Sequence, residues 1–171
     1  VLRDYDRIQE RAPFQLKQTE ARRVVNSALL LIHASATWFM VGLIWLIQAV
    51  HYPLMQMVGR AELVPYSLRH QQAITPVVGI PMLIEVATAA YLLVQDPQLR
   101  RSNWFLASCV LLVVIWVSTA FWQVPLHRAL LEGEDAERVK SLVLSNWVRT
   151  IAWSVRGLIV AGLVLSRLKP S

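Results

Sequence analysis

Four apolar stretches, each about 20 residues or longer, limit what this sequence can fold into more than any other feature. A helix needs about 20 mainly apolar residues to cross the roughly 30 Å of hydrocarbon in a bilayer. The stretches occupy 24–50, 76–94, 103–124 and 146–165. Only 16% of the residues are charged, whereas an ordinary soluble domain has roughly 25%. The sequence therefore predicts an all-α integral membrane protein, a four-helix bundle.

The N-terminal segment 1–23 is polar and basic, unlike the stretches that follow it. Leu2, Tyr5 and Ile8 recur at helical spacing and precede Pro13. This spacing predicts a short amphipathic helix at the membrane surface, followed by a linker.

The rest of the chain is predicted to form one transmembrane domain, 24–167, with a short tail at 168–171. The segments between spans one and two and between spans three and four, 51–75 and 125–145, are longer and more polar than the turn at 95–102. We expect both to contain short helices and to form a helical cap on the side of the membrane opposite the termini.

The distribution of Lys and Arg predicts the orientation. Outside the spans, ten lie on the side of the termini and five on the other side. Because cytoplasmic loops are enriched in Lys and Arg, both termini are predicted to face the cytoplasm, most simply across a bacterial inner membrane. The net charge of +6 is then a topology signal, so the expected partner is the lipid bilayer and not nucleic acid.

Polar side chains that are far apart in sequence come together at the predicted extracytoplasmic ends of the spans. These residues are His51, His70, Gln123, His127, Asn146 and Arg149. Polar residues inside spans are costly and usually mark functional sites. In an enzyme, His51 or His127 would be the general base, and Asn146 with Arg149 would stabilise developing negative charge.

A cofactor is a second interpretation of the same histidines. A metal ion needs three or four converging ligands, which His51, His70 and His127 could supply, although no paired-ligand spacing such as His-x-x-x-His is present. A haem or a chlorophyll-type pigment needs an axial ligand, for which His70 or His33 is suitable, with Gln123 as a further contact. The absence of any cofactor remains equally open.

Glu85 and Arg156 lie nine and ten residues into spans two and four. At 1.5 Å per residue both reach about 15 Å, near the bilayer centre, so we expect an ion pair between them. The pair could be a structural clasp or the floor of a ligand cavity. The tryptophans inside the spans could likewise pack in the core or line an apolar pocket; they are Trp38, Trp45, Trp116 and Trp153.

Four local motifs stand out along the chain: His51-Tyr52-Pro53-Leu54, the segment from Pro76 to Glu85, Gln123-Val124-Pro125-Leu126-His127 and Asn146-Trp147-Val148-Arg149-Thr150. As a set they resemble motifs of uncharacterised bacterial four-span membrane proteins that are distantly similar to the anthrone oxygenase-like family. The resemblance covers most of 27–160. It implies oxidation of a hydrophobic or aromatic substrate without an evident cofactor.

Two functions follow from this sequence. The first is a membrane oxidoreductase or oxygenase that acts on a hydrophobic substrate. The alternative is a non-catalytic accessory subunit of a respiratory or photosynthetic complex, which would contact other subunits through segment 1–23 and its lipid-facing spans. A small transporter or lipid-binding protein is a third, weaker interpretation. Nucleotide-binding and common hydrolase motifs are absent.

Overall fold

The computed structural model of the chain describes residues 2–132 and 136–168, and every element in these ranges is a helix. The α-helices are α1 (Leu2–Leu46), α2 (Tyr52–Met55), α3 (Arg60–Gln95), α4 (Pro97–Arg100), α5 (Asn103–Ser118), α6 (Val124–Ala129) and α7 (Ala136–Leu168). Two π-helical turns, η1 (Ile47–His51) and η2 (Thr119–Gln123), join α1 to α2 and α5 to α6. The all-α prediction is confirmed.

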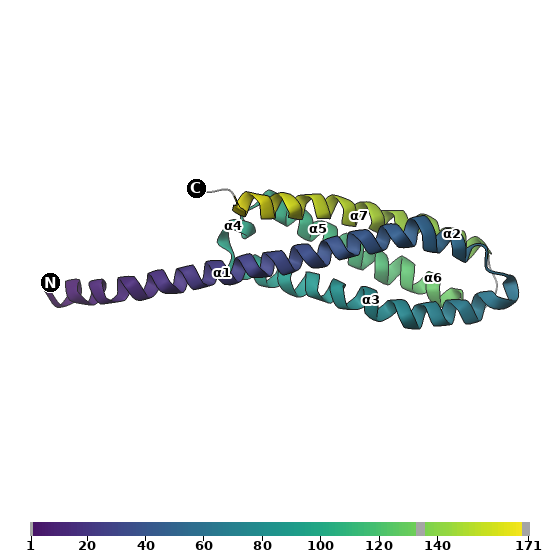
Figure 1. Ribbon diagram of the computed structural model, residues 1–171, viewed down its shortest axis with the longest axis horizontal. Coiled ribbons are helices and arrows are strands. Elements are labelled where there is room, and N and C mark those ends of the chain that lie inside the picture. Colours follow the sequence, from purple (N-terminus) through teal and green to yellow (C-terminus); the bar gives the residue numbers. More distant parts are fainter. Residues whose placement is uncertain (1, 133–135, 169–171) are drawn as a thin grey trace.

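Four helical rods are long and apolar enough to cross a membrane. They cover Gln15–Met55, Ala61–Gln95, Asn103–Ala129 and Glu137–Leu168. Figure 1 shows them side by side along one axis, with both chain ends at the same end of the bundle. We name this the terminal end, and the opposite end, which carries α2 and α6, the distal end. The predicted four-helix membrane bundle is confirmed.

The first helix is longer than the sequence predicted. α1 runs without interruption for 45 residues, about 68 Å, and passes through Pro13, where a linker was expected. The prediction of a linker is therefore wrong. Figure 1 shows the first part of α1 extending beyond the other helices.

The predicted cap is built from continuations of the spanning helices. α3 begins at Arg60, well before the predicted start of span two at Pro76, so only a short turn separates it from α2. In the same way, α7 begins at Ala136 and α6 extends span three to Ala129. The distal end is thus helical, as expected, but it contains no separate surface helices among the described residues.

The turn at the terminal end is fixed by two side-chain caps. Asp96 Oδ1 accepts hydrogen bonds from the backbone nitrogens of Gln98 and Leu99, 3.0 and 3.1 Å away, and so caps α4. Ser102 Oγ accepts one from Phe105 N at 3.3 Å and caps α5. Such caps satisfy amides that have no partner within the helix.

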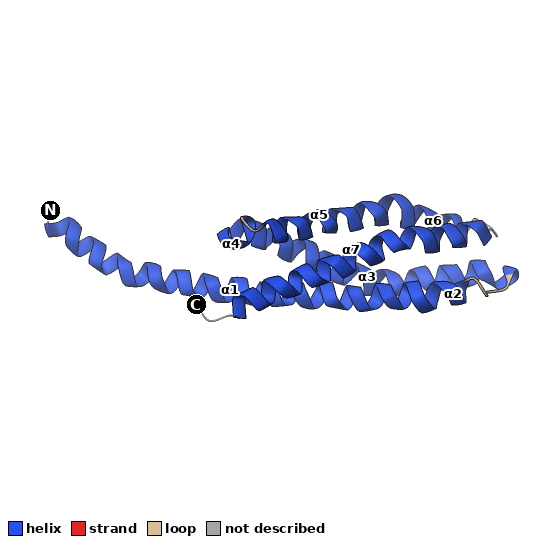
Figure 2. Ribbon diagram, turned by 90° about the horizontal axis from the view of Figure 1, so that it is seen from above, coloured by secondary structure: helices blue, strands red, loops and turns tan. Residues whose placement is uncertain are grey.

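The helices pack in the order α3, α1, α7, α5. α1 packs along both α3 and α7, and α7 packs along α5, whereas no comparable packing joins α3 to α5 in the described chain. In Figure 2, α5 and α6 lie on one side of α7, with α1 and α3 on the other. α7 lies close to α1 at Gly157, where a Cβ atom would lie 3.0 Å from Val41 Cγ2.

The bundle has a polar interior and an apolar exterior. Glu85, Asn146 and Arg156 have no exposed surface, whereas Phe121 is 73% and Val110 62% exposed. In water this distribution would be unfavourable, because apolar surface favours burial. In a bilayer it is the expected one, so the structure fits a lipid environment.

Candidate functional site

The polar interior contains two separate groups of side chains. The first, which we name the clasp, lies at mid-bundle and consists of His33, Thr37, Glu85, Thr88, Trp153 and Arg156. The second lies at the distal end around Arg149. Both groups project from the inner faces of the same long helices, but they differ in how completely their polar atoms are satisfied.

The ion pair expected at mid-bundle is present in the clasp. Arg156 Nη1 pairs with Glu85 Oε1 and also donates to Thr37 Oγ1 at 3.1 Å. Its Nη2 lies 2.9 Å from His33 Nε2, and its Nε donates to the carbonyl oxygen of Ser108 at 3.2 Å. Every nitrogen of the guanidinium therefore has an acceptor, although the group is completely buried.

The partners of Arg156 are satisfied as well. Trp153 Nε1 donates to Glu85 Oε2 at 3.2 Å, and Thr37 Oγ1 lies 2.8 Å from Glu85 Oε1. The second ring nitrogen of His33, Nδ1, lies 2.7 Å from Thr88 Oγ1. Because both of its ring nitrogens are engaged, His33 does not fit the predicted role of axial ligand. The clasp has the features of a structural network that links α1, α3 and α7.

Two π-helical turns position the distal residues. η1 and η2 each end two residues before a proline, Pro53 and Pro125. Proline has no N–H to donate to the carbonyl four residues earlier, so the α-helical bonding pattern is interrupted there. Instead, Tyr52 N bonds to the carbonyl oxygen five residues earlier, at Ile47, and Val124 N does the same with Thr119. π-turns of this kind occur frequently at functional sites.

Three histidine rings lie side by side at the distal end. The His51 and His70 rings stack with centroids 4.2 Å apart, and the His70 and His127 centroids are 5.6 Å apart. Stacked rings do not direct their nitrogens at a common point. Within the described ranges, no three His, Cys, Asp or Glu side chains are placed to hold a metal ion, so the structure does not support the predicted three-histidine metal site.

A pocket of about 240 Å³ adjoins these rings, and we name it the distal pocket. It lies between α3 on one side and α5, η2 and α6 on the other, where no helix packing closes the bundle. Its lining residues are Ile47, Tyr52, His70, Ile74, Thr75, Val78, Gly79, Met82, Trp116, Thr119, Gln123, Val124, His127 and Arg149. Most of the wall is apolar, with a small number of polar groups.

A chain of hydrogen bonds fixes one side of the distal pocket. Tyr52 Oη donates to Gln123 Oε1 at 3.2 Å, and Gln123 Nε2 donates to Ser145 Oγ at 2.8 Å. Ser145 Oγ in turn donates to the carbonyl oxygen of Leu142 at 3.2 Å. His127 Nε2 lies 3.5 Å from Tyr52 Oη, whose proton is already directed at Gln123. The chain thus favours the tautomer with a proton on His127 Nε2 and a lone pair on Nδ1.

Three residues of the distal pocket have buried polar atoms without a partner. These atoms are Arg149 Nε, His127 Nδ1 and Trp116 Nε1. Arg149 is only 5% exposed and forms no hydrogen bond or ion pair with any described residue. Its one specific contact is with the face of the Trp153 ring, 5.5 Å from the ring centroid. Buried polar atoms normally have partners, and a bound water or ligand would supply the ones that these three atoms lack.

The structure divides the predicted site residues into two sets. His70, Gln123, His127 and Arg149 line the distal pocket, whereas His51 and Asn146 do not, although His51 Nε2 and Asn146 Oδ1 are also buried without a partner. Asn146 Nδ2 instead donates to Gln48 Oε1 at 2.7 Å. Gln123, predicted to contact a cofactor, has both ends of its amide engaged in the hydrogen-bond chain.

Sequence reasoning did not single out two important polar residues of the distal pocket. Tyr52 was visible only as part of a motif, and nothing in the sequence pairs it with His127, 75 positions later. Trp116 was one of four interior tryptophans, and no local signal distinguished it from a packing residue. Both follow from the packing of three different helices.

Comparison of the chain with protein-family models, with curated proteins and with solved structures gave no match. The resemblance to the anthrone oxygenase-like family therefore remains a prediction, and any function has to be argued from the site itself.

Proposed function

We propose that the chain is a membrane oxidoreductase or oxygenase whose active site is the distal pocket. Its substrate would be a small apolar molecule that carries an oxygen atom and an acidic proton. The observation that supports this proposal is that Arg149 and His127 both line the distal pocket and each has a buried nitrogen, Arg149 Nε and His127 Nδ1, without a partner.

Arg149 is the group suited to bind the substrate oxygen. An unpaired charge inside a span costs at least about 2.5 to 3.5 kcal/mol on insertion scales. Arg156 is relieved of this cost by Glu85, but Arg149 has no such partner. A guanidinium in an apolar pocket attracts an oxygen that becomes negatively charged, such as an enolate or phenolate. Trp116, which also lines the distal pocket, would supply a second donor from Nε1.

His127 is the group suited to remove the proton. The hydrogen-bond chain through Tyr52 and Gln123 holds a proton on Nε2 and leaves the Nδ1 lone pair without a partner. A base oriented by a second residue is the usual arrangement for general-base catalysis. His51 is less suited, since it stacks on His70 and does not line the distal pocket.

The apolar wall determines the class of substrate. Ile74, Val78 and Met82 project from α3 into the distal pocket, and Gly79 between them leaves open space. The separation between α3 and α5 offers a route from the bilayer that avoids water. A substrate dissolved in lipid would therefore enter sideways, with its oxygen directed at Arg149 and its apolar part against α3.

Oxidation would follow proton removal. A carbanion conjugated to an oxygen can donate electrons directly to dioxygen, which requires no bound cofactor, and the family resemblance implies this type of reaction. With anthrone as a probe, loss of the methylene proton gives an anion with its charge on the oxygen. Reaction with one dioxygen then yields anthraquinone and one water.

The orientation is part of the proposal. From the excess of Lys and Arg at the terminal end we infer that both termini face the cytoplasm of a bacterial cell, with the distal pocket in the outer half of the inner membrane. The substrate would then be drawn from the outer leaflet.

The test separates proton removal from oxidation. The full chain is purified in detergent, and anthrone is added in D₂O under argon while deuterium exchange at its methylene carbon is followed by NMR. We expect exchange faster than in empty micelles, and oxygen uptake with anthraquinone formation when air is admitted. Arg149→Gln and His127→Gln should each lower the exchange rate by roughly 100-fold or more.

Arg128→Gln is the matched control, because Arg128 is exposed at the same end and does not line the distal pocket. His51→Gln distinguishes the two candidate bases and should retain most of the exchange. If Arg149→Gln and His127→Gln exchange at the rate of the unmodified chain, or if that chain does not exceed empty micelles, the proposed chemistry is wrong.

An accessory subunit of a larger membrane complex is the second candidate. The extension of α1 beyond the other helices favours it, because an isolated helix of this length gains stability by docking on another surface (Figure 1). His70, which has no hydrogen bond to any described residue, would then be the remaining candidate ligand for a haem or pigment. Co-purification of further subunits, with an absorption band of a bound pigment, would favour this function over the enzyme.

A further inference from the structure

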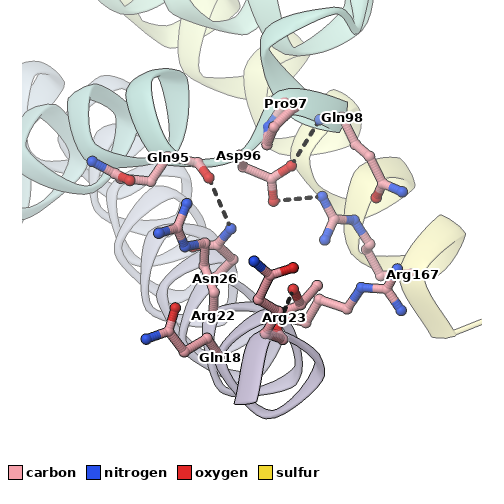
Figure 3. A pocket seen from close by; sticks show the side chains of 11 residues that line it. Gln18, Arg22, Arg23, Asn26, Gln95, Asp96, Pro97, Gln98 and Arg167 are labelled. Atoms are coloured by element: carbon pink, nitrogen blue, oxygen red, sulfur yellow. Dashed lines mark hydrogen bonds and ion pairs between the residues drawn. The ribbon is translucent and has the colours of Figure 1, made fainter. Parts of the chain in front are cut away.

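A second pocket, of about 550 Å³, lies at the terminal end, and we name it the terminal pocket. It is formed where α1 passes the turn between α3 and α4 and the end of α7 (Figure 3). Its lining residues are Gln15, Gln18, Thr19, Arg22, Arg23, Asn26, Gln95, Asp96, Pro97, Gln98 and Arg167. Neither the distal pocket nor the clasp shares a residue with it.

The terminal pocket has an excess of positive charge. Its one carboxylate, Asp96, is already occupied: Oδ1 accepts two backbone hydrogen bonds, and Oδ2 pairs with Arg167 Nη2 at 2.7 Å. Arg22 and Arg23 form no hydrogen bond or ion pair with any part of the chain that the structure describes. In Figure 3, Arg22 extends toward Gln95 and Arg23 toward Arg167. Both arginines are exposed, and both line the terminal pocket.

Neutral hydrogen-bonding groups surround these charges. Four glutamines contribute amides, and Thr19 contributes a hydroxyl. Asn26 is 5% exposed and donates from Nδ2 to the carbonyl oxygen of Gln95 at 3.4 Å, which leaves its buried Oδ1 without a partner. Guanidinium groups match phosphate oxygens, and a free amide oxygen accepts a hydrogen bond from a hydroxyl. The lining thus suits an anion that also carries hydroxyls.

The level of the terminal pocket along the bundle points to the source of this ligand. Asn26 lies at the start of the apolar part of span one, and Gln95 lies at the end of span two. Trp104, 69% exposed at the same end, has the placement of an aromatic residue at the interface between lipid and water. Phosphate groups of lipids occupy this level, and basic clusters next to a span attract anionic head groups.

We propose that the terminal pocket binds a phosphate group that carries hydroxyls, as in the head group of phosphatidylglycerol. Arg22 and Arg23 bind the phosphate oxygens, Asn26 Oδ1 accepts a hydroxyl proton, and the glutamine amides complete the contacts. A free glycerol phosphate offers the same groups from the aqueous side, so the experiment includes it. The inference does not depend on the activity proposed for the distal pocket.

The full chain is reconstituted in vesicles of phosphatidylcholine with a trace of spin-labelled phosphatidylglycerol or spin-labelled phosphatidylcholine. The fraction of each label that the protein immobilises gives its relative affinity. We expect a clear preference for phosphatidylglycerol. Arg22→Gln/Arg23→Gln should lower this preference by roughly tenfold or more.

Arg100→Gln/Arg101→Gln is the matched control, because it removes the same charge from exposed positions at the same end, outside the terminal pocket. It should retain most of the preference. Equal losses in the two double variants would show general surface attraction and overturn the proposal, as would the absence of any preference. Displacement of the label by added glycerol 3-phosphate would identify the free phosphate ester as the ligand, and no displacement would identify the lipid.

Discussion

Arg149 and Arg156 lie seven residues apart, two turns along the same face of α7, and both are buried. Arg156 has a carboxylate, a threonine, a histidine and a carbonyl as partners, whereas Arg149 has only an aromatic face. On the same helix, Arg156 therefore lies in a network that satisfies its hydrogen bonds, whereas Arg149 lies outside any such network. The comparison indicates that the clasp stabilises the bundle, whereas the unpaired, buried charge of Arg149 lowers its stability.

The largest effect is expected from breaking the clasp. Glu85→Gln removes the counter-charge of Arg156 and should lower the free energy of unfolding by about 3 to 5 kcal/mol, because it leaves a charge buried and unpaired. The measurement is unfolding of the detergent-solubilised chain followed by circular dichroism. Glu62→Gln, at an exposed position, is the control. A loss no greater than that of Glu62→Gln would contradict a stabilising clasp.

The opposite sign is expected at Arg149. Arg149→Met keeps a long side chain but removes the unpaired charge, so the free energy of unfolding should rise by about 1 to 3 kcal/mol. The same exchange at Arg156, Arg156→Met, should lower it, because Glu85 then loses its partner. Both values come from the same unfolding measurement. If the two variants change stability in the same direction, the contrast between the two arginines does not hold.

Filling the distal pocket should affect binding more than stability. Gly79 borders open space, so Gly79→Leu places a side chain in the volume that the ligand would occupy. We expect the affinity for anthrone to fall roughly tenfold or more, about 1.4 kcal/mol, as measured by quenching of tryptophan fluorescence. Gly42→Leu also meets open space, but outside this pocket, and should leave affinity unchanged. Equal affinities in both variants would place the binding site elsewhere.

The smallest effect is expected at the ion pair of the terminal end. Asp96→Asn preserves the cap on α4, since Asn caps as well as Asp, but removes the charge that pairs with Arg167. Asp96 is buried, but Arg167 keeps 23% of its side chain exposed and can turn its charge to water when residue 96 is neutral, so the unfolding free energy should fall by only about 1 kcal/mol. Comparison with Glu85→Gln measures how strongly the contribution of an ion pair to the unfolding free energy depends on its depth in the bundle. A loss as large as that of Glu85→Gln would show that depth has no such effect.

The sequence predicted the spans and the pairing of Glu85 with Arg156, because both depend on regular quantities, the length of an apolar stretch and the rise per residue. It could not predict where the helices end: the polar residues at 60–75 look like a loop, yet α3 runs through them. The residues that line the distal pocket could not be predicted from the sequence either. Whether His51 or His127 lines it depends on the rotation of each helix about its axis, which two π-turns alter.

The π-turns also affect how the distal end can vary. A regular α-helix turns by about 100° per residue, and a π-turn accommodates one more residue than an α-turn does. If the rod Asn103–Ala129 were α-helical throughout at its present length, every side chain after Thr119–Gln123 would be turned by about this angle, and His127 would lie away from Tyr52. Loss of a single residue within Thr119–Gln123 would instead restore α geometry and leave the later side chains facing as they do. These two short segments should therefore tolerate the loss of one residue, whereas a further insertion would turn the distal side chains away from one another.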